Sequence, residues 1–130
     1  MDERDRAILA RLRENSRLSN SEIARELNVS EGTIRKRISR LVSSGVIKQF
    51  TVVTSSSGID AIVLIRMDVK RAQDIIKLLK SRFSEIYEFS GRVDLAVKLT
   101  CGSVEELNRI VDEIRVIDGV KGTDTLIRLG

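Results

Sequence analysis

The chain has 130 residues, 42% hydrophobic and 32% charged, which suits one ordinary folded domain or two small ones and excludes a disordered tail. No apolar run approaches the roughly 20 residues of a membrane-spanning helix, and the charged amino-terminal residues lack the apolar segment of a secretory signal. The single cysteine, Cys101, has no partner for an internal disulfide. We therefore expect a reducing, cytoplasmic setting and no membrane contact.

The formal net charge is +4, and the whole excess falls in the first 50 residues. Residues 1–50 contain 11 lysines and arginines against 7 aspartates and glutamates, whereas residues 51–130 contain 12 of each. A localised basic excess favours a polyanionic partner, although a charge of this size is also ordinary for a soluble surface. The chain has no histidine and therefore lacks the commonest general base and metal ligand.

Three helices are predicted in the first 45 residues, and each begins at a residue that can cap it. The N-caps are Asp2, Ser19 and Ser30, and Glu22 completes a capping box at the second helix. Gly45 supplies the left-handed position that ends the third helix. The apolar residues at helical spacing, which we expect to form one core, are Ile8, Leu9, Leu12, Ile23, Ala24, Leu27, Ile34, Ile38 and Leu41.

The connection between the second and third predicted helices is very short. Only Asn28 and Val29 lie between them, and so short a connection between two amphipathic helices is typical of a helix-turn-helix. The third helix then turns the face opposite its apolar stripe toward solvent. From residue 30 to residue 48 the chain has five basic residues and one acidic residue, so that outer face is basic.

Basic and small polar side chains on one exposed helix face suit the major groove of duplex DNA. Glu31, Thr33 and Lys36 lie nearest the helix amino terminus, where bases are usually read. Glu31 either accepts a hydrogen bond from a cytosine amine or only complements the helix dipole, and we favour the second interpretation. Arg37 lies toward the buried face and either contacts DNA or forms a structural ion pair. The predicted DNA-binding residues are Ser30, Glu31, Thr33, Arg35, Lys36, Arg37, Arg40 and Lys48.

Residues 46–53 form a β-branched run that predicts a strand, the wing of a winged helix-turn-helix. Lys48 on this strand is placed to contact a backbone phosphate. We assign residues 1–54 to a winged helix-turn-helix DNA-binding domain with its exit strand. The alternative is a three-helix unit used for protein contacts, and the basic outer face favours DNA over it.

A serine-rich break at residues 55–58 precedes a second domain, which we assign to residues 59–130. Two βαβ units about 34 residues apart predict a ferredoxin-like βαββαβ domain, so the fold class of the chain is α+β. Ser103 and Glu106 predict a capping box on its second helix. The expected strands are residues 60–67, 86–89, 94–99 and 123–129, and the expected first helix is residues 71–80.

The predicted strands are apolar on both faces, which predicts a homodimer that pairs the open faces of two sheets. In the first strand, for example, Ile62 and Leu64 alternate with Val63 and Ile65. An apolar sheet face left in water promotes aggregation, and an isologous twofold interface is the commonest way to cover it. Such a dimer would present two recognition helices about 34 Å apart to a near-palindromic site of double-stranded DNA.

The motifs along the chain resemble those of the Lrp/AsnC, or feast/famine, transcription regulators of prokaryotes and archaea. The matching segments are residues 5–9, 18–24, 29–41, 45–47 and 119–125, and the resemblance covers nearly the whole chain. It implies that the second domain is of the RAM or ACT type and responds to a small effector, usually an amino acid. It also implies that dimers form through the sheets and assemble into octamers.

The resemblance places the effector between dimers, near the turn at residues 90–94 and the last strand. Gly91 would let the backbone approach a ligand, free amides would hold its α-carboxylate, and Asp94 would pair with its α-ammonium. An ordinary hairpin turn is the other interpretation of Gly91 and Asp94. The candidate effector-binding residues are Ser90, Gly91, Arg92, Val93, Asp94, Thr123 and Thr125.

The sequence therefore predicts a sequence-specific DNA-binding transcriptional regulator that responds to an amino acid. The alternative is an architectural protein that coats DNA with little sequence preference. We find no nucleophile paired with a base, no metal-ligand spacing and no phosphate-binding glycine loop, so we expect neither an enzyme nor a cofactor other than the effector.

Overall fold

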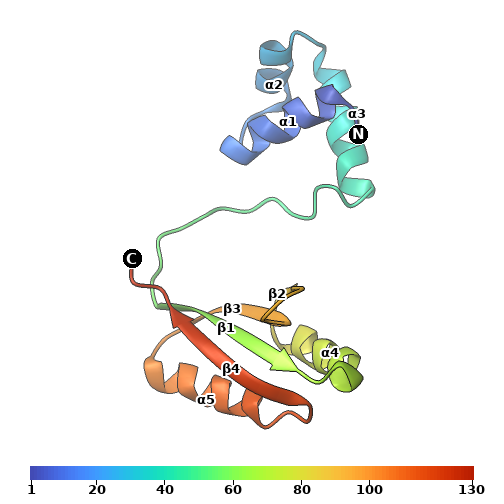
Figure 1. Cartoon of the computed structure of the whole chain (residues 1–130). Coiled ribbons are helices and arrows are strands. Elements are labelled where there is room, and N and C mark those ends of the chain that lie inside the picture. Colours follow the sequence, from blue (N-terminus) through green and yellow to red (C-terminus); the bar gives the residue numbers. More distant parts are fainter. The chain divides into compact units, whose positions relative to one another are not determined.

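The computed structural model describes all 130 residues as two compact units, Met1–Thr54 (unit 1) and Ser55–Gly130 (unit 2). Unit 1 consists of three helices, α1 (Glu3–Glu14), α2 (Asn20–Leu27) and α3 (Glu31–Ser43) (Figure 1). Unit 2 contains β1 (Ile59–Met67), a short 3-10 helix (Val69–Arg71), α4 (Ala72–Arg82), β2 (Glu85–Glu88), β3 (Leu95–Cys101), α5 (Val104–Arg115) and β4 (Val120–Ile127). No helix combines the length and the apolarity that crossing a membrane requires.

The three predicted N-caps of unit 1 are confirmed. In each case the capping side chain accepts a hydrogen bond from the backbone amide of the third residue of the helix. At α2 the capping box is complete, because the Ser19 amide also donates to Oε2 of Glu22 at 2.8 Å. Asn28 ends α2 in the left-handed conformation (φ 61°), which asparagine adopts more readily than most residues, and so makes the turn into α3.

The core of unit 1 is built from the predicted apolar positions. The fully or nearly fully buried side chains are Ile8, Leu12, Ile23, Ala24, Ile34 and Leu41. Leu27, Ile38 and Ile47 pack against this cluster. Leu9 differs from the prediction: it is only half-buried and faces the cavity described below.

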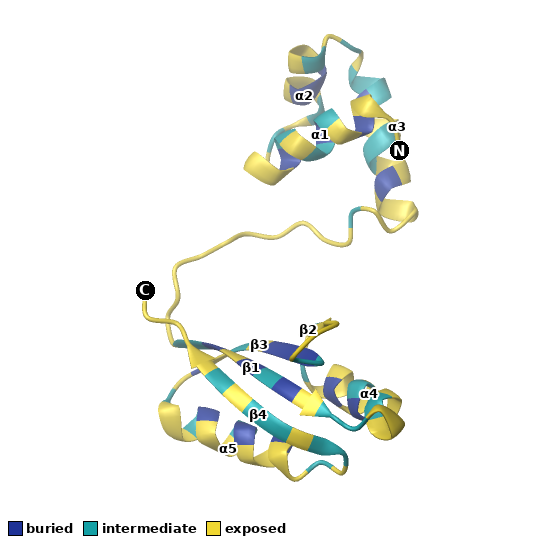
Figure 2. Cartoon of the chain, viewed as in Figure 1, coloured by how far each residue is buried: buried dark blue, intermediate teal, exposed yellow.

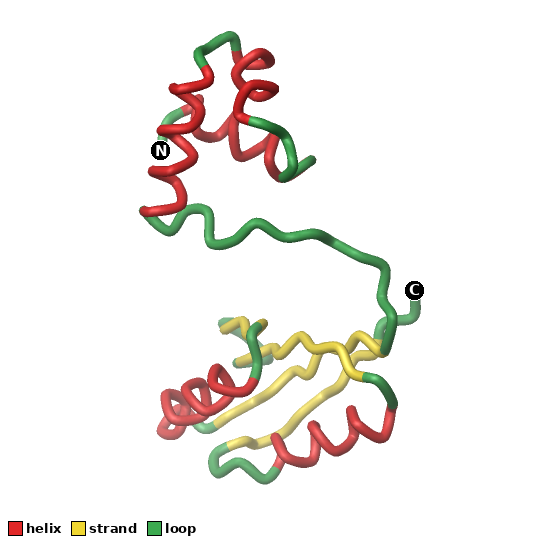
Figure 3. The backbone as a smooth tube through the Cα atoms, turned by 180° about the vertical axis from the view of Figure 1, so that it is seen from behind, coloured by secondary structure: helices red, strands yellow, loops and turns green.

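The predicted strand at residues 46–53 is wrong. These residues form a loop between α3 and β1 (Figure 3). Unit 1 contains helices and no strand. A strand requires a hydrogen-bonded neighbour, and unit 1 offers its backbone only isolated contacts. The Ile47 amide donates to the Leu41 carbonyl at 2.9 Å, and the Ser16 hydroxyl donates to the Thr51 carbonyl at 3.4 Å.

The ferredoxin-like topology of unit 2 is confirmed. The four strands form one antiparallel sheet in the order β2-β3-β1-β4, and α4 and α5 lie on the same face of it (Figure 1). Strand β4 begins three residues before its predicted start. The capping box of α5 is also altered, since the Glu106 carboxylate accepts from the Gly102 amide (2.9 Å) and not from the amide of Ser103.

The two faces of the sheet differ more than the sequence predicted. Ala61, Val63 and Ile65 of β1 are buried in the core between the sheet and the helices. Buried segments, dark blue in Figure 2, occur in the sheet and in both helices of unit 2. On the outer face the register pairs Ile62 with Leu126, but Leu64 with an aspartate and Arg66 with a glycine. The outer face is therefore mixed, with a small exposed apolar patch beside charged residues.

Candidate DNA-binding and effector sites

Helix α3 presents its predicted polar face to solvent. Ile34 (0% exposed) and Leu41 (4% exposed) hold the opposite face against the core of unit 1. Lys36 and Arg40 are exposed, and neither takes part in any ion pair of the chain. Their charges are therefore available to a polyanion.

The two hydroxyl groups predicted to contact DNA lie together at the start of α3. Ser30 Oγ accepts a hydrogen bond from the Thr33 amide at 3.1 Å, and the two side-chain hydroxyls share a hydrogen bond of 2.8 Å. A hydroxyl group can both donate and accept, so this cap leaves further capacity for hydrogen bonding.

Arg37 forms an ion-pair cluster with two carboxylates of the α1 capping box. Its Nη1 lies 2.7 Å from Oδ2 of Asp2 and 3.0 Å from Oδ1 of Asp5, and its side chain is 19% exposed. The hydrogen bond from Arg37 lowers the pKa of Asp2 to about 2, and the same contacts raise the pKa of Arg37. This geometry favours the structural ion pair over a DNA contact for Arg37.

Glu31 and Arg35 form a second ion pair, on the outer face of α3. Arg35 Nη1 lies 2.6 Å from Oε2 of Glu31, one helical turn earlier, and both side chains are partly exposed. The two predicted DNA-binding residues therefore meet in the first turn of the helix.

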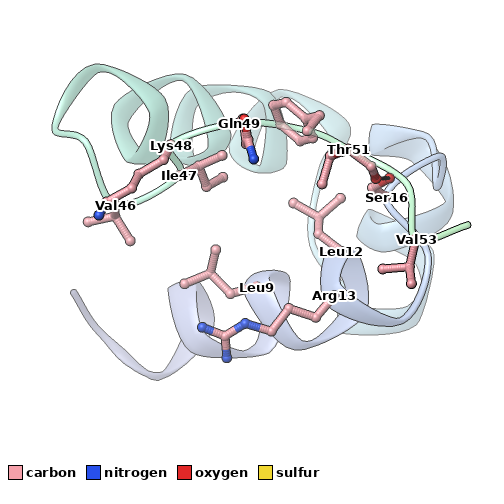
Figure 4. Close-up of a pocket in the computed structure, with 11 residues that line it drawn as sticks. Leu9, Leu12, Arg13, Ser16, Val46, Ile47, Lys48, Gln49, Thr51 and Val53 are labelled. Atoms are coloured by element: carbon pink, nitrogen blue, oxygen red, sulfur yellow. Dashed lines mark hydrogen bonds between the residues drawn. The ribbon is translucent and has the colours of Figure 1, made fainter. Parts of the chain in front are cut away.

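Lys48 is exposed on the loop that follows α3, beside an open, largely apolar cavity of about 400 Å³. Figure 4 shows Leu9 and Leu12 of α1 on one side of this cavity and residues 46–51 along the other. The loop and α1 therefore line the same cavity, and Lys48 stays exposed at it.

The turn at residues 90–94 is held to the sheet through Asp94. Its amide donates to the Ile65 carbonyl at 3.0 Å, and its carboxylate accepts from the Met67 amide at 2.8 Å. This second contact engages Oδ2 only, so the carboxylate can still accept further hydrogen bonds and the contact is compatible with both interpretations of Asp94. Gly91 has a φ of +138°, a conformation that disfavours any residue with a side chain, and Ser90, Gly91 and Arg92 are exposed.

Thr123 and Thr125 lie on β4 and share the face of the sheet that carries the helices. The register pairs them with the buried residues Ile65 and Val63 of β1. Thr123 Oγ1 accepts a hydrogen bond from Nε of Arg115 at 3.0 Å. Ile65 of β1 is paired with Thr123 on one side and accepts a hydrogen bond from the Asp94 amide on the other, so one strand separates Thr123 from the end of the turn at residues 90–94.

Sequence reasoning missed three of the partners in these sites. The sequence could have predicted the role of Asp5, because Asp5 follows Asp2 at the spacing of a capping box. The Glu31–Arg35 ion pair was also predictable, since oppositely charged residues four positions apart meet on a helix. The contact of Arg115 with Thr123 joins α5 to β4 and had no local signal.

The comparisons with known proteins cover both units. Residues 1–48 match the family model of winged helix-turn-helix DNA-binding domains, and residues 60–130 match that of the Lrp/AsnC ligand binding domain. The HTH-type transcriptional regulator LysM from Saccharolobus solfataricus is 38% identical over 133 residues, covering 99% of this chain and 94% of that protein. The HTH-type transcriptional regulator FL11 from Pyrococcus furiosus is 35% identical over 135 residues, covering 99% of this chain and 89% of that protein. The crystal structure of PH0061 is similar with a TM-score of 0.91 at 25% identity, covering 100% of this chain and 93% of that one.

The chain therefore carries a DNA-binding helix-turn-helix and a ligand-binding α+β unit, and this combination defines a transcriptional regulator. The chain belongs to the Lrp/AsnC family, which is a family of transcription regulators and not of enzymes.

The Arg37 ion-pair cluster predicts a pH-dependent stability of unit 1. The pKa of Asp2 is lower in the folded chain than its ordinary value of 3.8, so ionised Asp2 stabilises the fold above about pH 4. This stabilisation is lost as the pH falls toward 2. We expect Asp2→Asn, which keeps an N-cap, to unfold more readily than the wild type at pH 7 and to converge with it near pH 2. Chemical denaturation of the full chain at several pH values measures this difference.

The exposed Asp118 provides a matched control, since Asp118→Asn removes the same charge from unit 2 and leaves the cluster of unit 1 intact, so it should change stability little at any pH. A difference between Asp2→Asn and wild type that persists unchanged at pH 2 would contradict the cluster as its source.

Proposed function

We propose that the protein is a sequence-specific transcriptional regulator that binds duplex DNA through α3 and responds to an amino acid. The observation that carries the DNA-binding part is the exposed basic face of α3, with Lys36 and Arg40 free of ion pairs. Lys36, Arg40 and Lys48 would hold phosphates, while Ser30 and Thr33 would set the register on the duplex. Base reading then belongs to the first turn of α3.

We propose that the chain acts as a homodimer through the outer face of the sheet, with assembly into an octamer as a further step. The exposed apolar patch of Ile62 (38% exposed), Leu126 (50% exposed) and Tyr87 (51% exposed) supports this interface. Charged residues around the patch, such as Lys98 and Asp124, would form its polar rim. Dimerisation would present two copies of α3 to the two halves of a near-palindromic site.

The proposed effector is an amino acid bound near the turn at residues 90–94, with Thr123 and Thr125 contributed by another chain. The match of residues 60–130 to a ligand-binding domain supports an effector. Residues 90–92 are exposed, and their amides donate no backbone hydrogen bond, so they suit a carboxylate. Within one chain, strand β1 lies between the threonines and the turn.

The proposed phosphate-binding residues predict a strong salt dependence. We expect the double variant Lys36→Ala/Arg40→Ala to bind a promoter fragment at least tenfold more weakly than wild type at moderate salt. The slope of log K against log salt should fall by about 0.9 for each phosphate that the variant no longer neutralises. Fluorescence anisotropy over a salt series measures both quantities.

Lys77→Ala/Lys80→Ala is the matched control, because it removes two exposed charges from α4 of unit 2. It should bind nearly as well as wild type. Unchanged binding of the α3 variant would show that the recognition helix is wrongly assigned.

An amino-acid effector must stabilise the folded chain. A ligand present at 100 times its Kd adds about 2.7 kcal/mol, which raises the Tm of a small domain by about 10 °C or more. A thermal-shift screen of the twenty amino acids should therefore find at least one that raises the Tm. Thr125→Val, which removes one proposed hydroxyl contact at nearly constant volume, should reduce that shift. The absence of a shift with every amino acid would reject this effector class and leave DNA binding standing.

A further inference from the structure

The ion pair between Glu31 and Arg35 places a guanidinium group on the outer face of α3. The N–O distance of 2.6 Å holds Arg35 Nη1 against Glu31, which lies in the first turn of the helix. Side chains on a helix, arginine included, point toward its amino terminus, so the ion pair keeps Arg35 in the direction that the helix already favours. The guanidinium therefore lies about one turn nearer the helix amino terminus than its own Cα.

Gly32 leaves room for this arrangement. A Cβ at residue 32 would lie 3.6 Å from Arg35 Nη2, which is an ordinary van der Waals contact. The guanidinium therefore lies near the position that a side chain at residue 32 would take, and a side chain longer than a methyl group would compete for its place. The small residue between the two charged ones is part of the same arrangement.

The pair has little value as a stabilising interaction, because both side chains are substantially exposed, 58% for Arg35 and 41% for Glu31. The effect of the ion pair is to orient the Arg35 guanidinium. A guanidinium carries five N–H donors in a fixed plane, and the bond to Glu31 engages Nη1. The remaining donors can address a planar acceptor pair, for which the N7 and O6 atoms of guanine are the common partner in the major groove.

We propose that Arg35 reads a guanine in each half of the DNA site and that Glu31 is a positioning residue that orients Arg35 for this contact. The proposal deepens the proposed sequence-specific function and rests on it. Lys36 and Arg40, which have no acidic partner, hold phosphates and supply affinity without reading sequence. Discrimination at one base pair then depends on the Glu31–Arg35 ion pair, whereas affinity for any DNA sequence depends on Lys36 and Arg40.

Site selection from a random duplex pool with the full chain gives the preferred sequence, against which the variants are compared. For Arg35→Ala we expect the preference for one guanine per half-site to fall about tenfold or more, with a smaller decrease in affinity for unrelated DNA. Glu31→Gln should relax the same position by a smaller factor. Lys77→Ala is the control, since it removes an exposed charge from α4 of unit 2, and it should keep the preference.

A double-variant comparison separates the possible roles of Glu31. If Glu31 acts through Arg35, Glu31→Gln has no further effect on base preference in the Arg35→Ala background. An effect that persists there shows that Glu31 contacts a base itself, and an effect on stability alone shows that it only complements the helix dipole. Either result overturns the positioning role.

Substituting 7-deazaguanine at the selected guanine tests the contact on the DNA side. It should weaken wild-type binding and leave Arg35→Ala unaffected, because the N7 acceptor is removed. Equal weakening of both proteins overturns the assignment of Arg35 while the selected site still supports a sequence-specific regulator. If no sequence is enriched, the proposed function fails first, and the inference fails with it.

Discussion

The rotation of α3 about its own axis is the constraint on which the DNA-binding surface depends. Two buried side chains, Ile34 and Leu41, fix one face of the helix against the core. The Arg37 ion-pair cluster fixes its flank to the amino terminus of α1 through Asp2 and Asp5. Rotation by one residue, about 100°, would carry the basic face partly into the core, so the polar pattern outside is a consequence of the apolar and ionic contacts inside.

Much of unit 1 could be predicted because its determinants are local. A capping residue, an apolar stripe and a glycine lie within a few positions of one another, and all three N-caps were found where the sequence placed them. The strand at residues 46–53 could not be judged in the same way. β-branched residues favour extended backbone, but a strand also needs a partner that no local pattern reveals, and unit 1 supplies none.

In unit 2 the topology followed from the order of the elements, whereas the side-chain environments did not. The alternation of β1 predicted two apolar faces, yet Asp124 and Gly122 of β4 lie opposite its outer residues. Asp94 was proposed for a ligand and is found bonded to the Met67 amide. Both facts depend on strand register, which sets cross-strand neighbours and is not visible in one strand alone.

Hydroxyl-radical footprinting of the full chain on its selected sequence tests most directly whether paired copies of α3 bind a discrete site. Two protected patches on one face of the duplex, centred about one helical turn apart, are the predicted result. Continuous protection that spreads along the fragment as protein is added would contradict it and would indicate a protein that coats DNA.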